Sequence, residues 1–110
     1  SNILIKLMSQ QDFFIQKVQE APENKLFRFS LSKILFDQEQ FADAIPHLEK
    51  CIQLQDDWML AHILLGKSLL HSNQADEAKK ILEKALKLAI DQNHDDPKNE
   101  ILALLEHFKH

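Results

Sequence analysis

A period of 34 residues constrains this 110-residue chain more than any other feature of its sequence. A fixed period of this size is typical of solenoids, in which one helix-turn-helix unit cannot bury its apolar face alone and stacks on the next. We therefore expect at least two similar helical hairpins. The positions that match at this offset are Leu26 with Leu60, Leu31 with Leu65, Lys33 with Lys67, Leu35 with Leu69, Gln40 with Gln74, Ala44 with Ala78, Leu48-Glu49-Lys50 with Leu82-Glu83-Lys84, and Leu54 with Leu88.

Composition agrees with a single all-α domain whose helices are joined by short turns. One Gly and three Pro leave little turn chemistry, and the abundant Leu, Ala, Lys, Glu and Gln favour helices. A chain of this length forms one domain with one continuous core. We expect about six helices: an N-terminal helix over 3–20, two repeats over 25–58 and 59–92 that contain two helices each, and a C-terminal capping helix over 97–109.

Local signals place the expected helix ends more closely. Asn24 or Ala21 precedes the apolar run 26–36, and the next helix is expected over 41–54. Asp56 and Asp57 are expected to cap a helix over 58–71, since a short polar side chain can accept from the first free backbone N–H groups. The fourth helix follows over 75–90. Asp96 is expected to cap the final helix, with Pro97 in its first turn.

The residues that carry the period resemble those of the tetratricopeptide repeat family. That family has Leu-Gly in its first helix, and small residues at fixed places in the second. Such small side chains let two antiparallel helices approach to about 8–10 Å. Departures from the pattern are Ser32 at the Gly position, Arg28 and His62 at an aromatic position, and Asp56 and Ile90 at a Pro position. The residues at the family's positions are Leu31, Ser32, Leu35, Phe41, Ala44, Leu48 and Cys51, then Leu65, Gly66, Leu69, Ala78, Leu82 and Ala85.

The resemblance implies a function in protein-protein interaction. In this family the first helix of each unit lines a concave groove that commonly holds a peptide. We therefore assign the matching positions of this chain to such a groove, and Asp37 lies beside them in the same register. By that register the groove residues are Leu26, Phe29, Ser30, Lys33, Phe36, Leu60, Ile63, Leu64, Lys67, Leu70 and His71.

The chemistry of these positions leaves several uses open. The lysine and asparagine clamp by which chaperone-adaptor members of the family hold a carboxylate is incomplete, because only Lys33 and Lys67 fit it. The apolar side chains suit a helix or an extended segment anchored at residues three and four apart. Three alternatives remain: an open groove that binds a partner protein, a groove filled by a terminal helix of the same chain, and self-assembly as a homo-oligomer or as part of a longer repeat array.

Net charge and motifs argue against other functions. A net charge of −4 and a pI near 5.8 do not suit a nucleic-acid-binding protein. No apolar run reaches the roughly 20 residues of a membrane span. A single Cys cannot form an intrachain disulfide, so the expected compartment is the cytoplasm. With one Gly there is no phosphate-binding loop, and no Ser, His and Asp arrangement is visible. We expect a non-catalytic protein without cofactors.

Two apparent metal motifs have simpler explanations. His47 and Cys51 lie four residues apart on one helix, as metal ligands or a thiol and its base would. Cys51, however, occupies the small-residue packing position that Ala85 holds one repeat later, so we expect a buried thiol. Residues 91–95 begin like a calcium-binding loop, but Asp96 stands where such a loop needs Gly and Leu102 where it needs Glu. We expect an acidic loop and no metal.

Overall fold

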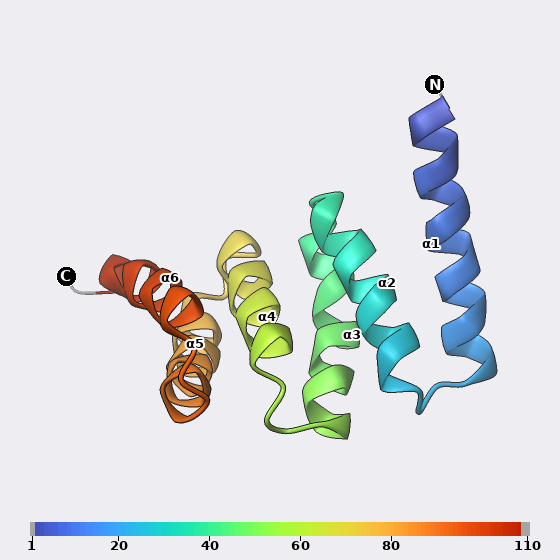
Figure 1. Ribbon diagram of the computed structural model, residues 1–110. Helices are drawn as coiled ribbons and strands as arrows, with labels where there is room; N and C mark the ends of the chain where they lie inside the picture. The colour runs from blue at the N-terminus through green and yellow to red at the C-terminus, as the bar shows by residue number, and fades with distance from the viewer. Residues whose placement is uncertain (1, 109–110) are drawn as a thin grey trace.

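The chain forms a row of stacked helices, and the prediction of an all-α fold of about six helices is confirmed. The computed structural model describes the backbone of residues 2–108 and the side chains of residues 10–108. The row runs from α1 at one end to α6 at the other (Figure 1). The helices are α1 (Asn2–Glu20), α2 (Lys25–Asp37), α3 (Phe41–Leu54), α4 (Met59–His71), α5 (Ala75–Asp91), α6 (Asp95–Leu105) and the short 3-10 helix η1 (Glu106–Phe108).

The helical hairpins α2–α3 and α4–α5 are held closely together by small side chains. At Gly66 an added Cβ would lie 2.5 Å from Cδ2 of Leu82, so α4 and α5 meet where α4 has no side chain. Ala78 and Ala85, which are fully buried, give α5 its close approach. In the first hairpin the position of Gly66 is taken by Ser32, which is also fully buried. Its Oγ donates to the Arg28 carbonyl of the same helix at 2.8 Å.

The turns within the hairpins share one backbone geometry. Glu39 and Asn73, 34 residues apart, have a positive φ of 60°. The residue after each donates its N–H to a carbonyl five residues earlier, from Gln40 to Leu35 and from Gln74 to Leu69. This bond closes the end of the preceding helix and reverses the chain. The turn from α5 to α6 has the same form around Asn93, with a φ of 58°.

The connection from α1 to α2 resembles the one from α3 to α4. Asn24 and Trp58 stand at equivalent positions, and each donates its N–H three residues back, to Ala21 and Gln55 respectively. In sequence register α1 therefore stands where a preceding unit would have its second helix. α1 packs against the core through Val18, which is buried, and through half-buried Phe14 and Ile15.

The capping residues predicted for α4 and α6 are wrong. The N-cap residue of α4 is Trp58, whose side chain makes no capping bond. Asp56 instead pairs with Lys84 at 3.4 Å. Asp96 lies in the first turn of α6, whose N-cap residue is His94. There the acids at 95 and 96 favour the helix through its dipole. Asn24 does cap α2, since its Oδ1 accepts from the Phe27 N–H at 3.0 Å.

The C-terminal helix begins two residues before the expected start and ends in η1. The expected end at residue 109 lies outside the described residues. None of the helices in the described range is long and apolar enough to span a membrane.

Candidate functional site

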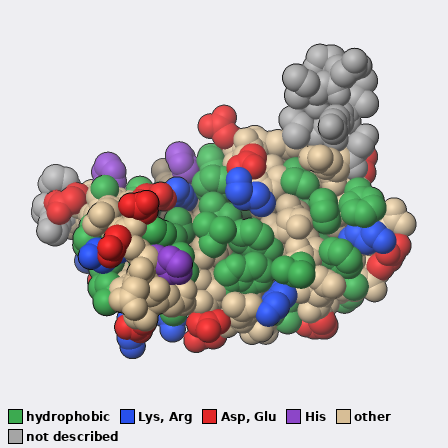
Figure 2. Space-filling view, viewed as in Figure 1, with side chains coloured by type: hydrophobic (Ala, Val, Ile, Leu, Met, Phe, Trp, Pro, Cys, Tyr) green, Lys and Arg blue, Asp and Glu red, His purple; other side chains and the backbone are tan. Residues whose placement is uncertain are grey.

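One face of the molecule carries α2 and α4, which are the first helices of the two hairpins, together with α6. Hydrophobic side chains gather on this face over α2 and α4 (Figure 2). Leu26 and Leu60, one repeat apart, are 65% and 44% exposed. Near them Phe29 stacks on Trp58 with ring centroids 4.7 Å apart. An apolar surface therefore extends across both repeats.

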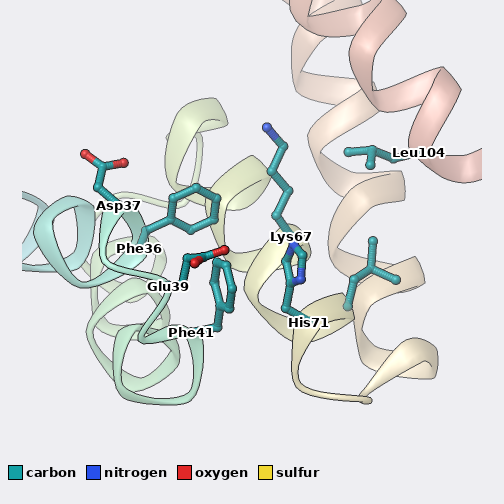
Figure 3. Close-up of a pocket in the computed structure, with 8 residues that line it drawn as sticks. Phe36, Asp37, Glu39, Phe41, Lys67, His71 and Leu104 are labelled. Atoms are coloured by element: carbon teal, nitrogen blue, oxygen red, sulfur yellow. The ribbon is translucent and has the colours of Figure 1, made fainter.

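A pocket of about 550 Å³ opens between the end of α2, the start of α3, the end of α4, and α6 (Figure 3). Two helical hairpins and the final helix thus contribute to one hollow. Its lining combines aromatic, aliphatic and charged side chains. The residues are Phe36, Asp37, Glu39, Phe41, Lys67, Leu70, His71 and Leu104.

Aromatic rings form one side of the pocket. The Phe36 and Phe41 rings meet edge to face, with centroids 5.3 Å apart. Phe41 stacks nearly parallel on the His71 imidazole, with centroids 4.1 Å apart and an angle of 8° between the planes. These contacts join α2, α3 and α4, and each ring limits the rotation of the next. The pocket therefore has one preformed aromatic wall.

Two of the charged groups that line the pocket, Asp37 and Lys67, are paired with charged groups just outside it. Lys33 Nζ lies 2.8 Å from the Asp37 carboxylate on the same helix. Lys67 of α4 forms an ion pair with Glu100 of α6. Among the described side chains Glu39 has neither a hydrogen bond nor an ion pair. Both lysines of the predicted groove are thus already occupied by carboxylates of the chain.

The structure brings together four of the predicted groove residues: Phe36, Lys67, Leu70 and His71. Five others, Leu26, Phe29, Ser30, Lys33 and Leu60, do not line this pocket, although Leu26 and Leu60 remain exposed.

Two predicted groove residues are corrected, because Ile63 and Leu64 are only 4% and 5% exposed. Ile63 packs in a core cluster with Ile101 of α6, and Leu64 belongs to the main core with Leu31 of α2. Both side chains are core residues and present almost no surface to a ligand. The alternative in which a terminal helix covers the groove applies to Ile63, which packs with α6.

Three pocket residues were not predicted: Glu39, Phe41 and Leu104. Phe41 had been assigned to an aromatic position of the repeat, but the pattern did not show that its ring faces the concave side. The sequence holds one indication that Glu39 is unusual, because the equivalent turn position one repeat later is Asn73. Leu104 could not be placed, because the 34-residue register ends before α6.

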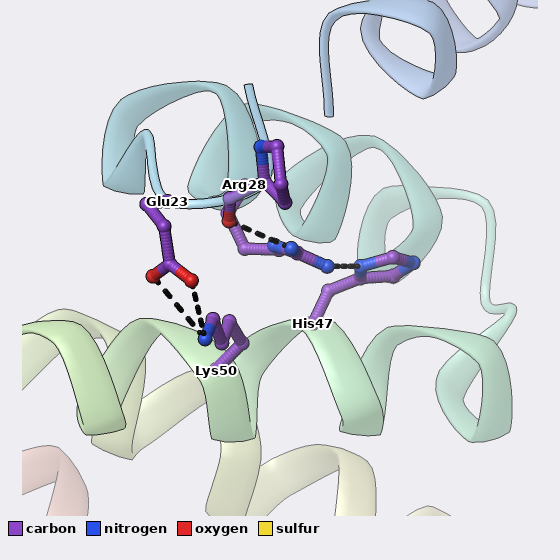
Figure 4. A network of polar contacts seen from close by, with 5 residues as sticks. Glu23, Arg28, His47 and Lys50 are labelled. Carbon is purple, nitrogen blue, oxygen red and sulfur yellow. Dashed lines mark hydrogen bonds and ion pairs between the residues drawn. The ribbon is translucent and has the colours of Figure 1, made fainter. Parts of the chain in front are cut away.

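The pair His47 and Cys51 does not form a reactive site. His47 Nδ1 lies 3.2 Å from Arg28 Nη1, and a guanidinium can only donate, so this nitrogen accepts. Figure 4 shows this contact beside the ion pair of Lys50 with Glu23. Burial, and then the Arg28 charge, lower the pKa of His47. Burial raises the pKa of the fully buried Cys51 thiol to about 11.

No group of three or more His, Cys, Asp or Glu side chains within the described range is arranged to hold a metal ion.

Sequence comparison identifies the family. The sequence profile of the tetratricopeptide repeat family matches residues 35–105, which is more than half of the chain. The chain belongs to the tetratricopeptide repeat family. None of the curated proteins compared with it is significantly similar in sequence.

Several solved structures share the fold. A solution structure of a protein from Bordetella parapertussis is 25% identical, with a TM-score of 0.74 over 88% of this chain and 84% of that one. The first tetratricopeptide repeat domain of Spaghetti, solved with the HSP90 peptide SRMEEVD, is 20% identical, with a TM-score of 0.80 over 96% and 82%. A MamA double mutant is 15% identical, with a TM-score of 0.73 over 96% and 67%. The last two likenesses concern the fold alone.

Proposed function

We propose that this protein is a non-catalytic interaction module that binds a peptide or helical segment of a partner protein on the face formed by α2, α4 and α6. The family and the peptide-bound neighbour support a protein-interaction module in general. The observation that carries the proposal for this chain is the concave pocket, where Phe36 of the first hairpin and His71 of the second line one hollow. We further propose residues 1–110 as one domain with repeats at 25–58 and 59–92, acting in the cytoplasm without a cofactor.

The site proposed here is narrower than the one expected from the repeat register. It comprises the pocket and the exposed apolar surface that continues along α2 and α4 to Leu26 and Leu60. Apolar anchors three and four residues apart on a bound segment would match such a surface. Its pocket volume suits one or two side chains of a partner and is within the range of ordinary ligand sites.

A displayed random-peptide library tests the proposal. The best-binding peptide is titrated against wild type, Phe36→Ala/His71→Ala and Phe13→Ala. Phe13 is an exposed aromatic of α1, so its variant removes comparable apolar area far along the chain. We expect the double variant to weaken binding by about tenfold or more, as loss of central aromatic anchors does, and Phe13→Ala to leave it unchanged.

His71→Ala alone provides a check on folding. His71 is exposed at the end of α4, so its removal leaves the amide spectrum native while it opens the stack with Phe41. Equal affinities for all variants, or a loss confined to Phe13→Ala, would refute the groove proposal.

Self-assembly is the second candidate, and exposed hydrophobic groups at the two ends of the row favour it. Phe13 of α1 is 51% exposed and Leu102 of α6 is 44% exposed. Stacking of one copy on the next would bury both, as in longer repeat arrays. Sedimentation at about 0.1 mM decides the question, because association linked to folding depends on protein concentration. A strict monomer there would remove this candidate.

A further inference from the structure

We propose that the pocket between α2, α3, α4 and α6 receives a cationic side chain, an arginine or lysine, of the bound segment. The inference rests on the proposed function, since it names the chemistry of the partner at the same site. Its basis is the position of Glu39, the pairing of the nearby charges, and the aromatic wall.

The backbone of Glu39 is the first line of support. Three tight turns within residues 2–108 contain a residue with φ near 60°, and two of them use Asn73 and Asn93. Asn adopts this left-handed conformation more readily than Glu does. Only the turn that borders the pocket uses a carboxylate there. A residue kept at a conformational cost is an indication of function.

The direction of the Glu39 side chain is the second line of support for a cation in the pocket. In Figure 3 its carboxylate points from the turn between α2 and α3 toward the wall formed by α4, among the residues that line the pocket. In the described structure this carboxylate has neither a hydrogen bond nor an ion pair. It is therefore available to a ligand without the loss of an existing contact.

The balance of charge also favours a cation. Among the described side chains around the pocket, the carboxylates of Asp37, Glu39 and Glu100 outnumber the ammonium groups of Lys33 and Lys67, so one negative charge is left over. An acidic ligand would have to displace Asp37 or Glu100 from its lysine. The first turn of α3, whose partial positive charge would attract an anion, already contains Asp43.

The aromatic rings that line the pocket also favour a cationic side chain. Phe36 and Phe41 meet edge to face, and Phe41 stacks on His71. Aromatic faces attract ammonium and guanidinium groups through their quadrupole, and several rings around one cation are a recurrent way to hold it. The stem of an arginine or lysine is apolar, so Leu70 and Leu104 suit it. A glutamate in the same place would find no unpaired lysine among the described side chains near the pocket and no favourable ring face.

The test uses three synthetic peptides of seven residues, acetylated and amidated, that differ only at the centre. The central residue is arginine, its neutral isostere citrulline, or glutamate, and leucines flank it. Each peptide is titrated at one fixed pH while backbone amide shifts of the full chain are followed. We expect the arginine peptide to shift the residues of the pocket and to bind about tenfold more tightly than the citrulline peptide.

Protein variants locate the effect. Glu39→Gln should weaken binding of the arginine peptide by about threefold to fivefold, the size of one exposed charge pair, and should leave the citrulline peptide unaffected. Glu49→Gln makes the same chemical change at an exposed position of α3 outside the pocket and should change nothing. Glu39→Asn should weaken arginine binding equally while it raises the melting temperature, since it restores the residue that the other turns use.

The outcomes separate the two proposals. Three results would overturn the cation pocket. The arginine and citrulline peptides could bind with equal affinity, or the Glu39→Gln variant could bind the arginine peptide as tightly as wild type does. The third is that the arginine peptide leaves the amide resonances of the pocket residues unmoved. The groove proposal would then still stand on the library-selected peptide and its Phe36→Ala/His71→Ala variant. If that selected peptide also shifts only α1, α5 and the part of α3 that lies outside the pocket, the groove proposal fails with it.

Discussion

The two helical hairpins have the same fold, yet their concave faces differ in what covers them. In α2, Phe29 is half-buried and Lys33 is exposed. In α4 the equivalent Ile63 is buried and Lys67 is paired with α6. The physical reason is position in the row: α4 lies between α2 and α6, whereas in the described chain α2 has such a neighbour on one side only. The same repeat position is therefore buried in one unit and only half-buried in the other.

The small-residue positions differ as well. The second hairpin uses Gly66 and Ala85, and the first uses Ser32 and Cys51 at the same places. All four are buried. The repeat requires little volume at these positions, but it accepts a hydroxyl or a thiol when the polar atom has a partner. Ser32 finds one in the Arg28 carbonyl.

The packing of α6 on the second hairpin can be weakened by a substitution at Ile101. Ile101→Ala should lower the free energy of unfolding by about 2–5 kcal/mol, because the side chain is fully buried and its loss leaves a cavity beside Ile63. Urea unfolding measures the change. Leu102→Ala, the neighbouring residue that is 44% exposed, should cost about 0.5 kcal/mol or less. Equal costs would show that α6 does not pack as described.

The thiol of the first hairpin should be unreactive. Burial raises the pKa of Cys51 from 9.0 to about 11, although Ser32 and Arg28 each act to lower it. The reactive thiolate is then about a hundredfold rarer near pH 8 than for an unperturbed thiol. We expect alkylation by iodoacetamide to be slower than in urea-unfolded protein by at least that factor. A native rate within threefold of the unfolded one would revive the possibility of a functional thiol.

The close contact of the second hairpin can be tested by adding one methyl group. Gly66→Ala places a Cβ 2.5 Å and 2.7 Å from Cδ2 and Cγ of the fully buried Leu82. Overpacking of this kind costs about 1–3 kcal/mol, against which the better helix propensity of Ala returns about 1 kcal/mol. We expect a net loss of about 1–2 kcal/mol in urea unfolding.

The comparison variant is Ser32→Ala. It adds no atom to the packed site, because Ser32 already has a Cβ. Its hydroxyl donates to a carbonyl of its own helix and also contacts the weakly polar Cys51 thiol, so the loss should be below about 1 kcal/mol. A larger loss for Ser32→Ala than for Gly66→Ala would contradict the packing described for the two hairpins.

The polar pair of the first hairpin should make its stability depend on pH. The second hairpin has His62 and Ile81 where the first has Arg28 and His47. Burial, and then Arg28, lower the pKa of His47 from its ordinary 6.5. Folding then favours the neutral imidazole, so the stability is fully present above pH 6.5 and is lost as the pH falls through the lowered pKa.

Urea unfolding at pH 7.5 and pH 5.5 checks this effect. Wild type should lose more stability over that interval than His47→Gln, since the two proteins share every other titrating group. Equal losses would mean that His47 does not sense its buried surroundings.

The sequence predicted the helices best where the period repeats. α3 begins and ends where expected, and α2, α4 and α5 differ from expectation by a residue at one or both ends. The matched pairs of leucines and alanines specify these hairpins because each small residue allows one close contact. After residue 92 the register ends, and the start of α6 then depended on Asp96 and Pro97, which misplaced it by two residues.

The site was harder to predict because it depends on elements outside the period. Register alone assigned Ile63 and Leu64 to the groove, whereas burial of Ile63 is decided by α6. Phe41 and Glu39 lie on or beside a turn, and their inward position follows from how two hairpins stack. The asparagine at the equivalent turn, Asn73, was the one signal in the sequence that Glu39 is unusual.

The most direct test of the account is the amide chemical-shift map of the full chain with its library-selected peptide at saturation. The account predicts the largest shifts at Phe36, Glu39 and His71, with smaller ones along α2 and α4 toward Leu26 and Leu60. Residues of α1 and the outer surface of α5 should remain unmoved. Shifts centred on Phe13 or Leu102, with His71 and Phe36 unchanged, would contradict it.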